Sequence, residues 1–247
     1  MRTNERFLSA LKSMNAFLKD DIANGHPWTY CNVKTKKAAN FPQARKKGLY
    51  LINCVDGVQW ALQIAGVPKS ALCWYGADGK IAYTTSNAEK EVQKYFNVIK
   101  TGGVTVQKLY DKMLLCDGDI LLGFQGFAHT CAYYGGEKSF DSGHAYCNGE
   151  RFRKWIGSLS HKSSKVNVIL RLKDRVQYRV QAGAYAEFSK YREQEEFLRS
   201  KGIPCTMVIE DDMYKAQVGL FNGKTNAKRM TEKLGKKGIT AIVKEIG

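Results

Sequence analysis

The stretch GLYLINCVDGVQWALQIAGV, residues 48–67, places a cysteine at the point where an apolar, strand-like run turns into a helix. Gly66 and Pro68 predict the end of that helix. The N–H groups and the dipole at a helix start favour the thiolate form of cysteine, which is the form that attacks carbonyl carbon. Cys54 is therefore the candidate nucleophile.

The composition predicts a globular protein. The chain has 247 residues, 44% of them hydrophobic, which is enough for one large domain or two small ones. No run approaches the roughly 18 apolar residues that a membrane span needs. Residues 2–20 predict a docked amphipathic helix and not a signal peptide, because one helical face gathers Phe7, Leu8, Leu11, Met14, Phe17 and Leu18.

Charge and cysteine usage narrow the partners and cofactors. The formal net charge of +16 predicts attraction to a polyanion. The seven cysteines are odd in number and none forms a close C-x-x-C pair, so neither a disulfide framework nor a zinc ribbon is indicated. We expect no metal and no cofactor.

The last 70 residues contain a duplication. With a constant offset of 36 residues, one set of positions matches another: Tyr178, Gln181, Gly183, Leu198, Lys201, Gly202 and Ile203 match Tyr214, Gln217, Gly219, Leu234, Lys237, Gly238 and Ile239. Each half reads as strand, helix, strand. Two halves predict a βαββαβ domain over 178–247, with one face of a four-stranded sheet left open.

The region before residue 173 has no repeat and predicts a separate α+β domain, with the boundary in the short polar segment 173–177. Ser86 is expected as the N-cap of a helix, with Glu89 as its capping-box partner. Another helix is expected over 104–115. The later segments predict antiparallel strands joined by glycine turns: ILLGF, AHTCAYY, EKSFD and NVILRL.

A cysteine nucleophile needs a base and a group that orients the base. His129 begins a predicted strand, whereas His26 and His161 lie in polar stretches where solvated histidines are the default expectation. If Glu137 joins the Gly135–Gly136 turn, the register brings Asp141 opposite Cys131, diagonal to His129 and on the same face. A strict two-residue turn would instead place Ser142 opposite His129.

We favour the first register, because a carboxylate is the best acceptor for the second imidazole N–H. Ser142 and His144 remain alternatives for this third position.

These residues resemble the NlpC-type cell-wall peptidases, a papain-like cysteine hydrolase family. The matching features are Asn53-Cys54 followed by VQWAL, the Gly118-Asp119 pair, and the pattern His-x5-Gly-x2-Lys-x2-Asp from His129 to Asp141. The resemblance covers roughly residues 25–172. The resemblance implies a papain-like fold, with Cys54 as nucleophile, His129 as base, Asp141 as orienting residue, and the Cys54 N–H and Tyr30 near the oxyanion hole. It also implies that the substrate is an amide in peptidoglycan stem peptides.

The chain departs from this family next to the nucleophile. The family has Asp-Cys-Ser-Gly where this chain has Asn53-Cys54-Val55-Asp56. Asp56 adds a negative charge to the first helical turn, where it favours the helix but opposes a nearby thiolate. We expect its side chain to point to solvent.

The duplicated domain resembles the sporulation-related repeat (SPOR) domain, whose ferredoxin-like βαββαβ sheet binds peptidoglycan glycan strands. Strand alternation directs Val180 and Ala182 toward the helices. The predicted glycan-binding residues on the open face are Arg179, Gln181, Lys215 and Gln217. Tyr185 and Phe221, expected in loops, are also predicted to bind glycan, and a core role is equally expected for each.

RNA-recognition domains share this topology, but the aromatic pattern of their third strand does not occur in MYKAQVG, so nucleic acid is not the expected partner.

The sequence therefore predicts a peptidoglycan hydrolase of residues 1–173 joined to a wall-binding domain of residues 178–247. The alternatives are an N-acetylmuramoyl-L-alanine amidase with the same triad, and a non-catalytic protein that binds the wall or nucleic acid. With no signal peptide, such a protein would be made in the cytoplasm and act at the bacterial wall after phage-mediated release or secretion.

Overall fold

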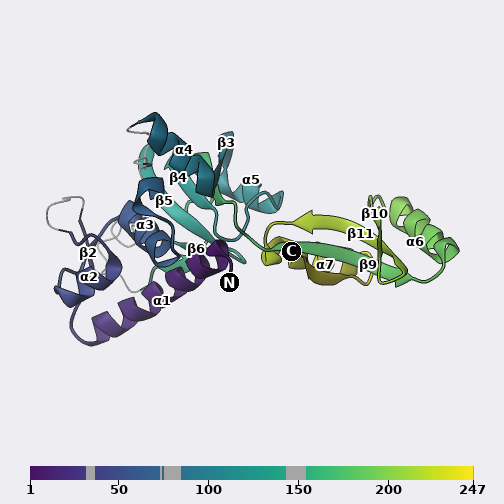
Figure 1. The fold of residues 1–247 in the computed structure, drawn as a ribbon, viewed down its shortest axis with the longest axis horizontal. Coiled ribbons are helices and arrows are strands. Elements are labelled where there is room, and N and C mark those ends of the chain that lie inside the picture. Colours follow the sequence, from purple (N-terminus) through teal and green to yellow (C-terminus); the bar gives the residue numbers. More distant parts are fainter. Residues whose placement is uncertain (32–36, 73, 75–84, 143–153, 247) are drawn as a thin grey trace. The chain divides into compact units, whose positions relative to one another are not determined.

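The computed structural model describes residues 1–31, 37–72, 74, 85–142 and 154–246. The chain forms two compact units, Met1–Asp174 and Arg175–Gly247, called the first and second units below. Each combines helices with an antiparallel sheet, so the α+β class predicted from the sequence is confirmed at that level (Figure 1).

The first unit contains a six-stranded sheet and a small parallel pair of strands. Its helices are α1 (Thr3–Ala23), α2 (Phe41–Lys46), α3 (Cys54–Ile64), the 3-10 helix η2 (Lys69–Leu72), α4 (Ser86–Tyr95) and α5 (Val106–Asp111). Its strands are β1 (Thr29–Tyr30), β2 (Leu51–Ile52), β3 (Phe96–Thr105), β4 (Ile120–Phe124), β5 (Phe127–Gly135), β6 (Lys138–Phe140), β7 (Ile156–Ser158) and β8 (Lys165–Leu172).

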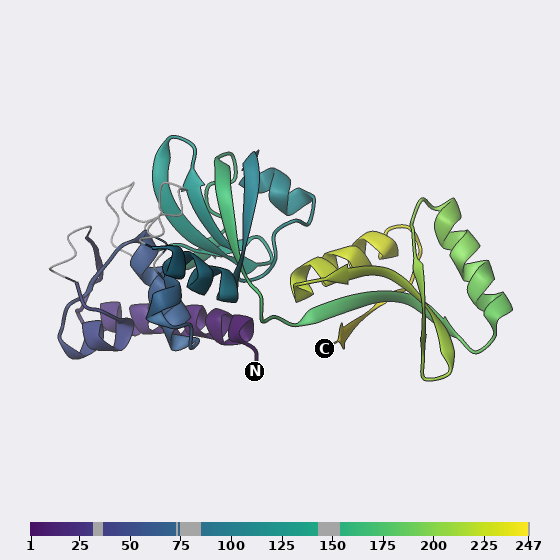
Figure 2. The same cartoon turned by 45° about the horizontal axis from the view of Figure 1, so that its top comes forward.

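The strand order β3-β8-β4-β5-β6-β7 is antiparallel at every neighbouring pair. Strand β4 is buried along its whole length, because both faces of the sheet are covered: Ile120 and Leu122 enter one hydrophobic cluster and Leu121 enters the other. Helices α1 and α3 contribute to the first cluster, and α5 contributes to the second. Figure 2 shows α1 and α3 together at one side of this sheet.

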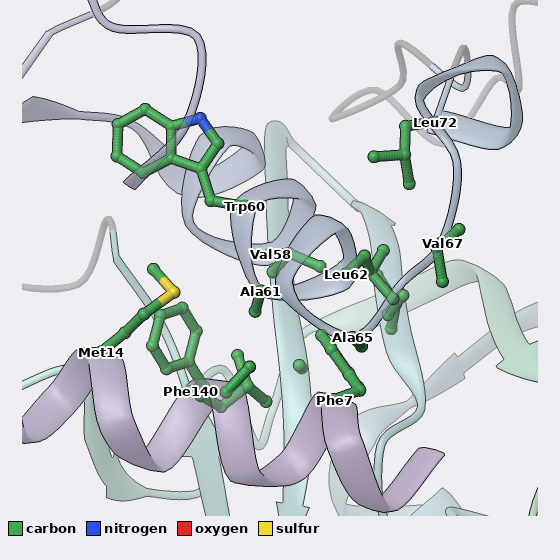
Figure 3. Packing of buried hydrophobic residues seen from close by; sticks show 14 of the residues in the cluster. Phe7, Met14, Val58, Trp60, Ala61, Leu62, Ala65, Val67, Leu72 and Phe140 are labelled. Atoms are coloured by element: carbon green, nitrogen blue, oxygen red, sulfur yellow. The ribbon is translucent and has the colours of Figure 1, made fainter. Parts of the chain in front are cut away.

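Helices α1 and α3 pack against each other through the cluster drawn in Figure 3. Val58 and Ala61 of α3 lie toward Phe7 of α1, and Phe140, next to Asp141 in the chain, lies beside Met14. All five side chains are fully buried. The predicted face of α1 is confirmed except at Phe17, which is 40% exposed and lies under the guanidinium of Arg45.

Two sequence predictions in the first unit were wrong, and two strands were missed. The N-cap of α4 is Thr85 and not Ser86, because the Thr85 hydroxyl accepts the N–H of Ala88. The helix expected over 104–115 covers only Val106–Asp111, since Val104 and Thr105 pair with β8 as the end of β3. Strands β3 and β7 were not predicted.

The second unit is a four-stranded antiparallel sheet with two helices. Its elements are β9 (Gln177–Tyr185), α6 (Phe188–Ser200), β10 (Thr206–Glu210), β11 (Met213–Phe221), α7 (Lys224–Gly235) and β12 (Ile242–Ile246), in the sheet order β10-β11-β9-β12. Val180 and Ala182 lie in the core between sheet and helices, as predicted.

The strand pairing reproduces the 36-residue repeat as an internal twofold. Tyr178 pairs with Phe221, and the equivalent Tyr214 pairs with Tyr185. The equivalent residues Gln181 and Gln217 pair with each other, so the twofold passes through this pair. The two halves of the repeat therefore meet at the centre of the sheet.

Candidate functional site

Cys54 is the first residue of α3, and the sequence before it fixes this helix start. Asn53 is the N-cap, and its side chain accepts the N–H of Asp56 at 2.8 Å. The Asp56 carboxylate accepts the Asn53 N–H at 3.1 Å in return, which completes a capping box. The Cys54 N–H belongs to the first turn, whose N–H groups have no acceptor within the helix.

Asp56 does not point to solvent, contrary to expectation. In addition to its capping contact, its carboxylate forms an ion pair with the Lys37 ammonium, whose side chain is 5% exposed. The Asp56 carboxylate thus binds the Asn53 N–H and the Lys37 ammonium, and it stabilises the helix start.

The structure brings His129 and Asp141 into direct contact. Strand β5 carries His129, and its Nε2 lies 3.0 Å from Oδ2 of Asp141 in a buried environment. Burial alone lowers the pKa of His129, but hydrogen bonds to Asp141 and to the Cys54 thiol outweigh it and raise the pKa to about 10. Because Asp141 occupies Nε2, Nδ1 is the ring nitrogen left for the thiol.

The register that allows this contact is the one we favoured. Ala132 pairs with Phe140 and Tyr133 pairs with Ser139, while Glu137 has joined the turn with a φ of 58°. Extending this pairing by one residue sets Asp141 opposite Cys131. The turn itself is Gly136–Glu137, because Gly135 pairs with Lys138 beyond a register shift. The register that would place Ser142 opposite His129 is excluded.

Tyr30 lies beside the nucleophile. Its hydroxyl is 3.9 Å from the Cys54 sulfur, and strand β1 holds it there by pairing in parallel with β2, the strand that leads into α3. A tyrosine hydroxyl at this distance is a second donor near the sulfur, next to the Cys54 N–H.

Ser142 and His144 are the alternatives to Asp141 as the residue that orients His129. The Ser142 hydroxyl is directed to the helix start and not to His129: it donates to the Asn53 carbonyl oxygen at 2.8 Å. His144 lies outside the described residues.

His161 is a site residue that sequence reasoning missed. Its Nε2 lies 3.5 Å from the same Asp141 oxygen that His129 contacts, and the two imidazole rings are 4.7 Å apart. The start of β5, the end of β4 and the start of β8 share one end of the sheet, which brings the loop before β8 to His129. No fixed spacing in the sequence signals this, because it depends on the strand order.

Two phenylalanines pack on this pair of histidines. Phe124 lies 5.6 Å from the His129 ring and 5.0 Å from the His161 ring, measured between centroids. Phe127 contacts the same two rings at 5.9 and 5.0 Å. His26, in contrast, is exposed and stacks on Tyr50.

Two of the predicted glycan-binding residues of the second unit form ion pairs within the sheet, which was not expected. Arg179 and Lys215 are buried and form ion pairs with Glu210, which also binds Lys244. These three cations, with Lys244 contributing most, lower the pKa of Glu210 to about 2. Two of the predicted ligands are thus neutralised within the sheet.

The other four predicted residues lie around the internal twofold. Gln181 is buried and pairs with the half-buried Gln217. Tyr185 and Phe221 lie at strand ends and not in loops. Their rings fold back over Gly183 and Gly219, where an added Cβ would come within 2.4 and 2.7 Å of them, and they pack against the core, which was one of the two roles expected for them.

Comparisons with known proteins give one similarity. No family model matches the chain, and no curated protein matches it. Among solved structures, the chain is similar to the solution structure of the peptidoglycan binding domain of the B. subtilis cell wall lytic enzyme CwlC, with 26% sequence identity over 31% of this chain and 98% of that chain. The TM-score is 0.28, which does not establish a shared fold. Within the described residues, no helix is both long and apolar enough to cross a membrane.

Proposed function

We propose that this protein is a cysteine hydrolase that cleaves an amide bond in cell-wall peptidoglycan. The observation that carries the chemistry is the chain of contacts from Cys54 to His129 to Asp141, with the sulfur at a helix start and the imidazole held by a buried carboxylate. This is the set of groups that nucleophilic catalysis by a thiol requires.

In the proposed reaction, Nδ1 of His129 takes the thiol proton and the Cys54 sulfur attacks the amide carbonyl carbon. The Cys54 N–H and the Tyr30 hydroxyl donate to the developing oxyanion. The carbon–nitrogen bond breaks as His129 returns its proton to the leaving amine. Water, deprotonated by His129, then hydrolyses the thioester, which releases the carboxylic acid and restores the thiol.

The wall as substrate is supported by the motif resemblance of residues 25–172 and by the duplicated βαββαβ unit. The unit would hold glycan through its sheet, raising the local concentration of the hydrolase at the wall. The net charge of +16 favours anionic wall polymers. The protein would be made in the cytoplasm and reach the wall by phage-mediated release or by secretion.

The test compares lysis of purified sacculi by the wild type, Cys54→Ala and Cys205→Ala, with circular dichroism to verify folding. Cys205 is a half-buried thiol of the second unit and serves as the matched control. We expect Cys54→Ala to abolish the loss of turbidity and Cys205→Ala to preserve it. Undiminished lysis by Cys54→Ala would refute the nucleophile.

Mass spectrometry of the released fragments identifies the bond. New amino termini within the stem peptide indicate a peptidase, and lactyl ends without peptide indicate an amidase. If the wild type binds sacculi and releases nothing, the protein is a binding protein and the enzymatic proposal fails.

A further inference from the structure

Three potential metal ligands converge on one point of the site. His129, His161 and Asp141 each offer one ligand atom within 4.8 Å of the other two, and each histidine approaches Asp141 through its Nε2. Oδ2 of Asp141 is shared: it is 3.0 Å from the first nitrogen and 3.5 Å from the second. The proposed triad uses only one of these two nitrogens.

These separations fit a tetrahedral zinc ion. Zinc binds histidine nitrogen and carboxylate oxygen at roughly 2.0–2.2 Å, so neighbouring ligand atoms in a tetrahedron lie roughly 3.3 Å apart. The two distances to Asp141 lie on either side of that value. To bind the same ion, the coordinating nitrogens of His129 and His161 must also come to this separation. His161, which would move for this, lies in a loop and has a φ of 54°.

The surroundings favour ligation. Two histidines and one carboxylate form a donor set that borderline divalent ions such as Zn²⁺ and Co²⁺ prefer. Phe124 and Phe127 pack on both imidazoles, which limits rotation of the rings and excludes water from one side. Three protein ligands leave a fourth position for water.

We propose that His129, Asp141 and His161 bind one Zn²⁺ ion, and that this binding reversibly blocks the hydrolase. The metal site stands on the geometry alone, whereas the inhibition rests on the proposed function. Zinc on Nε2 of His129 displaces the hydrogen bond to Asp141 and leaves the remaining ring proton on Nδ1. That nitrogen then no longer accepts a proton, so His129 cannot take the Cys54 proton and pass it to the leaving amine.

His161 is the residue that separates the two roles, because it is a ligand in the metal site and not a member of the proposed triad. The binding test titrates the full-length protein, freed of metal, with Co²⁺ followed by visible absorption, and with Zn²⁺ in competition with a chromogenic chelator. The variants are His161→Gln and, as a control, His26→Gln, which removes an exposed histidine.

We expect the wild type and His26→Gln to bind one equivalent of metal, and His161→Gln to bind it about tenfold more weakly or worse, because one of three protein ligands is lost. Equal affinity of wild type and His161→Gln would overturn the proposed site. So would loss of binding in His26→Gln.

The inhibition test measures sacculus lysis against free Zn²⁺, with each variant normalised to its own metal-free rate. The Zn²⁺ concentration for half inhibition should rise about tenfold or more in His161→Gln. An unchanged value would refute inhibition through this site. Metal binding by a protein that never lyses sacculi would refute the proposed function and leave the metal site standing.

Discussion

The hydroxyl of Ser142 donates a 2.8 Å hydrogen bond to the carbonyl oxygen of Asn53. This bond joins the segment directly after strand β6, which contains Asp141, to the N-cap residue that precedes the nucleophile. The two halves of the proposed site, from the helical part and from the sheet, are therefore fixed to each other next to the reacting groups. A net contribution of about 1 kcal/mol is typical of such a bond.

Gly57 makes this junction possible, and Gly57→Ala should disrupt it. A Cβ at this position would lie 2.3 Å from the Ser142 hydroxyl oxygen and 2.9 Å from its Cβ. We expect the free energy of unfolding to fall by about 1–3 kcal/mol, the usual cost of overpacking, and lysis to fall with it. Urea unfolding followed by tryptophan fluorescence measures the change, since all four tryptophans lie in the first unit.

Two further variants test the cause. Gly157→Ala is a control in the first unit, where the added carbon would meet only the Lys154 Cε at 3.7 Å, and it should not destabilise the protein. Combining Gly57→Ala with Ser142→Gly removes the clashing atoms and should recover part of the lost stability. If the loss of free energy of unfolding in the double variant equals the sum of the losses in the two single variants, the clash does not cause the destabilisation.

Cys54 should react with iodoacetamide faster than its exposure predicts. Only 4% of this residue is exposed, whereas Cys31 and Cys205 are half-buried. Proton transfer to His129 generates the thiolate, which is the reactive form. Peptide mass spectrometry at neutral pH should show Cys54 alkylated about tenfold or more ahead of Cys205. If Cys54 is alkylated more slowly than both Cys31 and Cys205, it is an inert buried thiol.

Asp141→Asn should shift the alkaline limit of activity toward lower pH. The leaving amine needs a protonated His129, so kcat/KM of the wild type should fall as the pH rises through about 10, the raised pKa of this group. Asp141 raises that pKa by a hydrogen bond and by its charge, so its neutralisation lowers the pKa. The fall should then begin at lower pH.

The measurement is a pH–rate profile of the wild type, Asp141→Asn and the exposed control Asp111→Asn. The control profile should coincide with that of the wild type. An alkaline limit that does not move in Asp141→Asn would contradict the assigned role of this carboxylate.

Glu210→Gln should reduce the stability of the second unit at neutral pH and have less effect in acid. The pKa of Glu210 is lowered to about 2 by Lys244, Lys215 and Arg179. A depressed folded-state pKa stabilises the fold above the unfolded value of about 4.5, and this contribution is lost as the pH falls toward 2. The difference in free energy of unfolding between wild type and variant should therefore become smaller as the pH falls from about 4.5 to about 2.

Far-UV circular dichroism during urea unfolding reports both units, and tryptophan fluorescence reports the first unit alone. The predicted change should appear in the circular dichroism transition and not in the fluorescence transition. A variant effect that is the same at pH 6 and pH 2.5 would show that the charge of Glu210 is not what stabilises the sheet.

Local patterns in the sequence predicted much of the fold. The start of the helix at Cys54, the strands with continuous apolar runs and the 36-residue repeat depend on neighbouring residues or on simple periodicity. Strand β3 was missed because FNVIKTGGVT has two glycines in its interior and is a strand through its pairing with β8. That pairing is not a local property.

The candidate site was predictable where spacing within one hairpin decided it. Two registers were possible between β5 and β6, and each gave a definite neighbour for His129. His161 was not predictable, because its place beside Asp141 depends on the order of strands across the sheet. The partners of Arg179 and Lys215 were missed for a similar reason, since Glu210 reaches them from another strand.

The pairing of Gln181 with Gln217 has a consequence for how a long ligand would be held. Rotation by half a turn about this pair exchanges Arg179 with Lys215 and Tyr185 with Phe221, residues of similar character. A linear polymer lying across the two central strands would therefore meet nearly the same side chains whichever of its ends came first. Such a surface would not discriminate the direction of the polymer. The second unit could therefore bind the polymer in either of two opposite orientations.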